Sequence, residues 1–268
     1  MASWWNRSER LRSVLMVLVA MLVIWEALCW ALKIRPFILP APSLVLKDFV
    51  SAPAYFLKHS GYTLLITSVG FIVAVILGVT CAVGIVYSKF LDRILSAMLV
   101  SLNAVPKVAL APLFVIWLGT GTEPKIAISI MIAIFPIVID TVLGLKSVDP
   151  EMVNLAKSCR ASTLKILLKI RFPNALPSIF AGMKVAISFS LVGAIVGEFV
   201  AGSIGLGHII LLSQGNFDTP RVFVALTLLA LLGTILFYLV DVAESLLLPW
   251  HVSQRSVHGD APVVQGGL

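Results

Sequence analysis

Charged residues are scarce in this sequence. Only 12% of the 268 residues are Asp, Glu, Lys or Arg, and 59% are apolar, whereas a soluble domain is about one quarter charged. Residues 60–88 and 222–240 contain no Asp, Glu, Lys or Arg at all. Each stretch is long enough for a membrane-crossing helix, which needs about 20 apolar residues. This composition argues against an ordinary soluble enzyme or binding domain and indicates an integral membrane protein.

The sequence also has little that points to catalysis or metal binding. Its three cysteines and four histidines are scattered, without the spacing of a disulfide framework or a metal site. No Gly-x-x-x-x-Gly-Lys-Ser/Thr phosphate loop occurs, so the chain has no ATP site of its own. We therefore predict no catalytic residue, no metal and no cofactor in this chain, and we expect it not to be an enzyme.

Six membrane-spanning helices are predicted, which makes the chain an all-α, polytopic membrane protein. The predicted spans are 13–32, 62–87, 95–118, 125–145, 178–200 and 221–248. They belong to one transmembrane domain over residues 1–252. Between the first two spans, residues 43–58 are expected to form a short helix at the membrane interface. The tail 253–268, rich in Gly, Pro and Val, is predicted to be a disordered cytoplasmic segment.

The positions of the basic residues predict the orientation. Six Lys or Arg residues lie in the connection 146–177 against two acidic residues, whereas the connection 201–220 contains no Lys or Arg. Because basic residues in short loops are retained in the cytoplasm, 146–177 should be cytoplasmic, with both termini on the same side. The net charge of +7 is spread over such connections and forms no single stripe, so lipid is the expected contact and nucleic acid is not.

The cytoplasmic connection 146–177 is unusually long and has a helical pattern. Asp149 can cap a helix that has Pro150 at its first position and Glu151 in its first turn. Residues 161–163 are expected to break and restart that helix, and Pro173 to end the second piece. Two short helices that project from a membrane domain are suited to docking in a groove of a soluble partner.

Lys107 is the most deeply placed charge, because thirteen uncharged residues precede it and fifteen follow it. It faces the translocation route or dimer axis, or else it pairs with carbonyls or with an acidic residue such as Glu198. Glu198 precedes a glycine-rich turn that includes Gly202 and Gly205, which is either a flexible outer turn or a gate.

Four other charges lie within about two turns of a predicted cytoplasmic end and are expected at the membrane interface. They are Asp140, Lys184, Asp241 and Glu244. Glu26 lies towards the outer half of the first span, where it either pairs with a neighbouring helix or has a role in transport.

The connection 146–177 resembles the EAA loop of bacterial ABC importer permeases of the binding-protein-dependent kind. The matching positions are Asn154-Leu155-Ala156, Arg160-Ala161-Ser162, Phe172-Pro173 and Leu176-Pro177. The sequence departs from that loop where Asn154 replaces an acidic residue, Leu155 an alanine and Arg160 a glycine. Further segments resemble the branch that serves nitrate, sulfonate, taurine, bicarbonate and thiamine precursors. They are 39–43, 105–119, 181–184, 197–202 and 205–207.

This resemblance implies the permease subunit of a type I ABC importer in the bacterial inner membrane. Its partners would be a second permease copy, two cytoplasmic subunits that bind ATP and Mg, and an external solute-binding protein. Its solute would be small and polar, with anionic solutes included. A carrier driven by an ion gradient is the alternative, because it would use the intramembrane carboxylates directly.

The resemblance further implies that docking residues lie in the loop. They are Glu151, Asn154, Leu155, Ala156, Lys157, Ser158, Arg160, Ala161 and Ser162. The residues expected along the translocation path or at a gate are Lys107, Glu198, Gly202 and Gly205.

Overall fold

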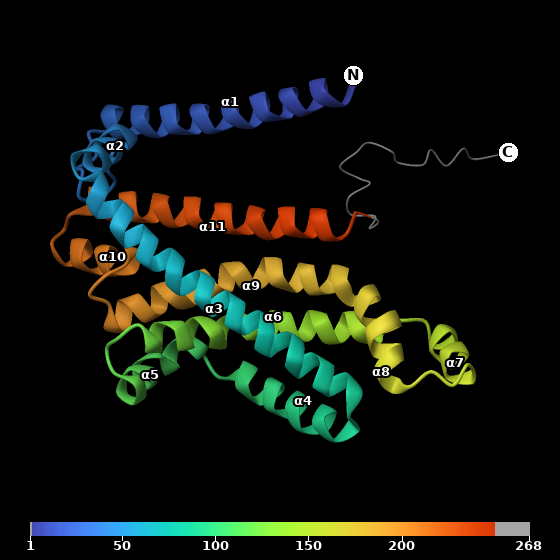
Figure 1. Cartoon of the computed structure of the whole chain (residues 1–268). Helices are drawn as coiled ribbons and strands as arrows, with labels where there is room; N and C mark the ends of the chain where they lie inside the picture. Colours follow the sequence, from blue (N-terminus) through green and yellow to red (C-terminus); the bar gives the residue numbers. More distant parts are fainter. Residues whose placement is uncertain (1, 250–268) are drawn as a thin grey trace.

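The computed structural model describes residues 2–249, and within them every regular element is a helix (Figure 1). The all-α prediction is therefore confirmed for this part of the chain. The predicted tail 253–268 lies outside the described residues.

Five long helices form the body of the molecule. They are α1 (Ala2–Ala31), α3 (Pro53–Tyr87), α6 (Glu123–Lys146), α9 (Phe172–Ala201) and α11 (Thr219–Leu247). Among the described residues, four helical segments are long and apolar enough to cross a membrane, namely α3, α6, α11 and the continuous segment Thr163–Ala201 that contains α9. The apolar part of α1, Met16–Ala31, is shorter than these.

Short helices connect the long ones. They are α2 (Pro42–Ser51), α4 (Lys89–Ala104), η1 (Lys107–Leu110), α5 (Ala111–Leu118), α7 (Pro150–Ser158), α8 (Thr163–Ile166), η2 (Leu167–Arg171) and α10 (Leu206–Gly215). The interfacial helix predicted at 43–58 ends at Ser51, and Pro53 begins α3, because proline is accepted in the first turn of a helix.

The span predicted at 95–118 is broken in the structure. Helix α4 ends at Ala104, and Val105 and Pro106 are extended, with ψ values of 131° and 99°. Proline has no N–H to donate and disfavours helical backbone in the residue before it. The chain then resumes as η1 and α5, so this region consists of two helical pieces with Lys107 directly after the break.

Helices α3, α6 and α9 pack closely because small residues line their contacts. The Ser129 hydroxyl on α6 lies 2.7 Å from the Ser190 hydroxyl on α9, and Ser190 Oγ donates to the Thr67 carbonyl on α3 at 2.8 Å. A Cβ added at Gly193 would lie 2.5 Å from the Ser129 Cα. Small residues that allow close approach are typical of helix contacts in membranes.

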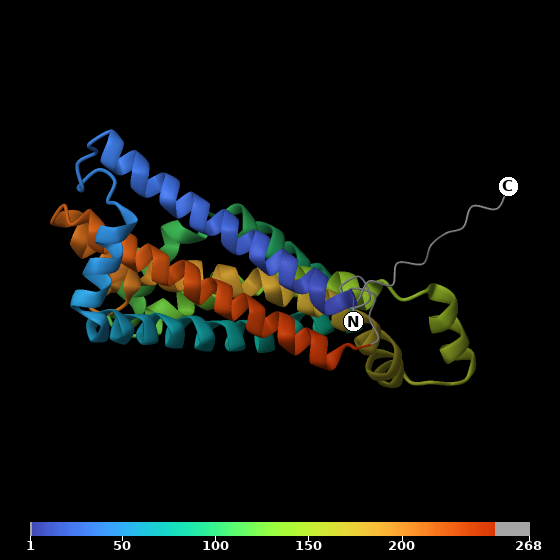
Figure 2. The same ribbon diagram turned by 90° about the horizontal axis from the view of Figure 1, so that it is seen from above.

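Helices α3, α6, α9 and α11 lie side by side, whereas α1 stands apart from them over most of its length (Figures 1 and 2). The long helices define two ends of the molecule. Helix α7 projects beyond the bundle at one end, where α1 begins and α11 ends. The opposite end carries α2, α5 and α10. The segment predicted as cytoplasmic thus shares an end with the first residues of α1.

Candidate coupling loop and translocation site

Helix α7 begins where the sequence predicts it. The Asp149 side chain accepts a hydrogen bond from the Glu151 N–H at 2.8 Å, and Pro150 occupies the first helical position. The cap satisfies one of the N–H groups that a helix start leaves unpaired. Residues 146–177 are called the candidate coupling loop from here on, and the start of its first helix depends on local sequence alone.

Helix α7 ends in a left-handed turn at Arg160, whose φ is +56°. The Arg160 N–H donates to the Lys157 carbonyl at 2.8 Å, and the Ala161 N–H donates to the Ala156 carbonyl at 3.0 Å. These two bonds form a Schellman motif, whose left-handed position is usually glycine. Arg160 therefore adopts the backbone that suits the glycine of the family loop.

The second helical piece starts after the predicted break but does not stop at Pro173. Ser162 caps α8 by accepting from the Lys165 N–H at 3.4 Å. A π turn, η2, then joins α8 to α9, and Pro173 lies in the first turn of α9. The prediction that Pro173 ends the helix is wrong, because the helical backbone continues from Thr163 through Pro173 to Ala201. Proline cannot donate to the preceding turn, and the regular α-helical pattern gives way to the π turn directly before it.

Most of the predicted docking residues are exposed. Ala156 and Ala161 are half-buried, and the exposed ones are Glu151, Asn154, Leu155, Lys157, Ser158, Arg160 and Ser162.

Several large apolar side chains of the loop are also exposed. Leu155 is 68% exposed and Met152 is 55% exposed, whereas Val153 is buried. Leu164 and Leu168 on the following helical segment are also exposed. Met152 was not among the predicted docking residues, although its spacing of three residues from Leu155 indicates a shared helix face.

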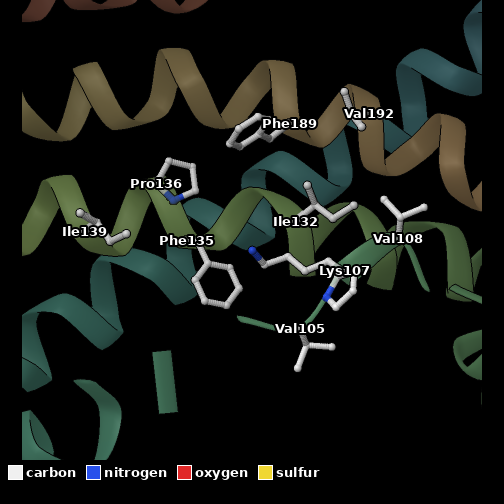
Figure 3. A pocket seen from close by; sticks show the side chains of 10 residues that line it. Val105, Lys107, Val108, Ile132, Phe135, Pro136, Ile139, Phe189 and Val192 are labelled. Atoms are coloured by element: carbon white, nitrogen blue, oxygen red, sulfur yellow. The ribbon is translucent and has the colours of Figure 1, made fainter. Parts of the chain in front are cut away.

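Lys107 lines a cavity of 510 Å³ between the α4–α5 break, α6 and α9 (Figure 3). The other nine lining residues are Phe135, Phe189 and seven Val, Ile and Pro residues. The Lys107 ammonium lies 4.1 Å from the centroid of the Phe135 ring, within the distance of a cation–π contact. One cation thus points into an otherwise apolar pocket.

Glu198 is completely buried and binds the turn that follows its own helix. Its carboxylate accepts hydrogen bonds from the Thr63 hydroxyl on α3 and from the Gly207 N–H, both at 2.7 Å. The Leu206 N–H in turn donates to Thr63 Oγ1 at 2.9 Å. The carboxylate is therefore satisfied by α3 and by the start of α10.

The glycines of this turn pack directly against Glu198. Gly205 has a φ of +128°, and a Cβ added there would overlap the Glu198 carboxylate. A Cβ added at Gly202 would overlap the Glu198 carbonyl oxygen. The Gly205 N–H also donates to His59 Nδ1 at 3.0 Å. The turn is thus fixed by hydrogen bonds to α3 and α9.

Lys125 is a buried cation that the sequence analysis missed. It is 1% exposed, and its ammonium donates to the Tyr62 hydroxyl at 3.1 Å. The Tyr62 hydroxyl also lies 3.1 Å from Thr122 Oγ1. Lys125 is the first residue of a predicted span, a position at which a lysine is expected to lie at the membrane interface. The packing of α3 on α6 shows that its side chain is enclosed.

Four of the five remaining charged positions form ion pairs or hydrogen bonds between helices. Lys184 on α9 forms ion pairs with Asp241 and, at 2.5 Å, with Glu244, both on α11. Glu26 on α1 accepts hydrogen bonds from the Ser43 N–H at 3.0 Å and the Ser43 hydroxyl at 2.7 Å. Glu26 therefore contacts the neighbouring helix α2, which was one of the two expectations for it.

Comparison with known proteins identifies the chain's family. Residues 74–248 match the family described as "Binding-protein-dependent transport system inner membrane component". This chain belongs to that family. The match contains α6, the candidate coupling loop, α9 and α11.

Similar proteins cover nearly the whole permease. It is 35% identical to a riboflavin transport system permease protein of Chloroflexus aurantiacus over 238 residues, which are 88% of this chain and 89% of the relative. It is 30% identical to a formylaminopyrimidine transport permease protein of Halalkalibacterium halodurans over 250 residues, 93% and 100% of the two chains. A taurine transport system permease protein of Escherichia coli is 27% identical over 256 residues, 92% of each chain.

The permease is thus a multi-pass inner-membrane protein and a transport subunit of the ABC importer type, as the sequence predicted. The resemblance to the nitrate, sulfonate and taurine branch is confirmed by relatives of these kinds.

Proposed function

We propose that this permease forms the translocation path of an ATP-driven importer for a small polar solute, anionic solutes included, which an external binding protein delivers. Two cytoplasmic ATPase subunits dock on residues 149–171. The observation that carries the proposal is the projection of α7 from the bundle with Leu155 and Met152 exposed on it.

Exposed apolar side chains on a projecting helix favour a partner with an apolar groove. Leu155 and Met152 lie three residues apart on α7, and Leu164 and Leu168 lie four apart on the next helical segment. Removing a large apolar side chain from water contributes about 1.5–3 kcal/mol. A helix held by such anchors in a groove is a common mode of recognition.

The transport cycle in this proposal is alternating access. ATP and Mg bind to the partner subunits, and no cofactor binds to this chain. When the ATPase subunits close, α7 and α8 move with them, and the segment Thr163–Ala201 transmits the movement to the outer turn. Lys107 lies on the path, and Glu198, Gly202 and Gly205 form a gate at its outer end.

The proposal includes six spans in one transmembrane domain with both termini in the cytoplasm, and a homodimer of permeases. The placement of both termini on one side is supported by the course of the helices, because α1 begins and α11 ends on the side of α7. The two pieces on either side of the Pro106 break together count as one span. Non-helical backbone at membrane depth is accepted where it lines a cavity, and the break borders the Lys107 pocket.

An ion-driven carrier remains the second candidate, because Glu198 is a buried carboxylate between helices. Its carboxylate already accepts two hydrogen bonds from fixed donors, which favours a structural role over a coupling-ion site. The two candidates differ in their energy source.

The deciding experiment is solute uptake by the complete transporter in proteoliposomes with its binding protein. We expect uptake to require internal ATP and to continue when an uncoupler and a sodium ionophore abolish the ion gradients. Uptake that stops on collapse of a gradient at constant ATP would establish the carrier instead. The permease without its ATPase, which should show no ATP hydrolysis, is the control.

A further inference from the structure

The size of the Lys107 pocket bears on which solutes it holds. Its 510 Å³ fall within the range of about 300–1,000 Å³ that is usual for small-molecule sites. A compact inorganic anion has a volume of only a few tens of Å³, since one water molecule takes up about 30 Å³. A compact anion would therefore contact only part of the pocket wall.

The polarity of the pocket also disfavours a compact anion. Among the ten lining side chains that the structure describes, only Lys107 carries a nitrogen or oxygen atom. A small anion that leaves water needs hydrogen-bond donors on several sides, because an ion in an apolar environment loses its hydration. A flat ring loses little hydration from its faces and gains contacts with apolar walls.

The aromatic residues are placed to bind such a ring. Phe135 on α6 and Phe189 on α9 both line the pocket (Figure 3). The Lys107 ammonium lies at the Phe135 ring face. A lysine ammonium has three N–H donors, so it can contact this ring and still donate to an acceptor atom at the edge of a bound molecule.

We propose that this pocket binds a flat aromatic or heteroaromatic solute that carries an oxygen or nitrogen acceptor at its edge. Phe135 packs against the ring, and Lys107 donates to the acceptor. Compact anions are selected against. This inference rests on the proposed function, because it takes the pocket to lie on the translocation path.

The test is equilibrium dialysis of the purified permease in lipid nanodiscs. The ring probes are uracil, benzoate and 4-methylumbelliferone, and the compact probes are nitrate and taurine. We expect at least one ring probe to bind at least tenfold more tightly than either compact probe, after subtraction of binding to nanodiscs without protein. Phe135→Leu should weaken that binding about 5- to 10-fold, the usual size of an aromatic contact.

Matched variants separate recognition from folding. Phe199→Leu, on α9 but outside the pocket lining, should leave ring binding unchanged. Lys107→Met should weaken ring binding at least fivefold, and Lys107→Arg should retain it, because arginine keeps the charge and the donors. Each variant is compared with the wild type by thermal melting, so that a misfolded protein is recognised.

Several results would overturn the assignment. They are binding of nitrate or taurine as tight as that of the rings, ring binding that does not respond to Phe135→Leu, and no binding above that of empty nanodiscs. The last result is expected if an acyl chain or the second copy fills the pocket. Failure of the proposed function is separate, because it would appear as absent ATP-dependent uptake whichever probes bind.

Discussion

The buried carboxylate of Glu198 accepts a hydrogen bond from the backbone N–H of Gly207, nine residues further along the chain, at 2.7 Å. This bond links the end of α9 to the start of α10. The same carboxylate lies where a side chain at Gly205 would have to be. The conformation of the turn therefore depends on the Glu198 side chain and on the absence of a side chain at Gly205.

Gly205→Ala should destabilise the permease. The added Cβ would overlap the Glu198 carboxylate, and alanine is strained at a φ of +128°, at a cost of about 1–3 kcal/mol. Thermal melting of the purified protein should shift to lower temperature. Gly215→Ala is the control, because a Cβ there meets nothing within 4 Å. Equal melting of the two variants would contradict the packing described for this turn.

Thr63→Val should weaken the link between α3 and the turn. Valine has nearly the same shape but leaves the Leu206 N–H and one Glu198 oxygen without their partner, and each buried unsatisfied group costs about 1–3 kcal/mol. We expect lower thermal stability and reduced uptake. Thr80→Val is the control on the same helix, since that exposed hydroxyl donates only to the Ile76 carbonyl. A Thr63→Val protein as stable as the control would contradict the network.

Arg160→Gly should stabilise the candidate coupling loop. Left-handed backbone costs a non-glycine residue about 1–2 kcal/mol, and the greater freedom of glycine in the unfolded chain offsets about 0.5–1 kcal/mol of the gain. Amide hydrogen exchange over residues 150–166 should therefore slow by severalfold. Lys157→Gly, inside α7, should speed it, because glycine in a helix interior is unfavourable. Faster exchange in Arg160→Gly would contradict the role of the turn.

Leu155→Asp should detach the ATPase subunits while the permease still inserts. Leu155 is exposed in the isolated permease, so the change costs the permease little, but it would place an unpaired charge in the proposed groove at a cost of about 2 kcal/mol or more. Co-purification of the ATPase should fall at least tenfold. Lys47→Ala, an exposed position on α2 at the opposite end of the molecule, should have little effect. Normal co-purification with Leu155→Asp, at equal membrane abundance, would show that α7 is not the docking element.

Local features of the loop could be predicted from the sequence. The Asp149 cap, the proline at the first position of α7 and the break before Ser162 all depend on residues a few positions apart. The left-handed turn at Arg160 was marked only by its alignment with a glycine of the family loop. Arginine itself has no preference for that backbone.

Contacts between distant segments could not be predicted. Lys184 and its partners Asp241 and Glu244 lie in separate spans, and a sequence does not show which faces of two helices meet. Lys125 was missed for the same reason. The break at Val105 has a local signal in Pro106, but the predicted span 95–118 extends across it because a hydropathy window averages over single residues.

The π turn η2 joins α8 to α9 in a continuous helical segment of 39 residues, Thr163–Ala201, which changes direction between α8 and α9 (Figure 1). The end next to α7 carries exposed Leu164, and the far end carries Glu198. In the proposed transport cycle, a displacement of α8 therefore reaches the α9–α10 turn without passing through a flexible linker. Sharp bends in helices occur at π turns and at prolines, so the stiffness at η2 and at Pro177, inside α9, determines how much of the displacement is transmitted.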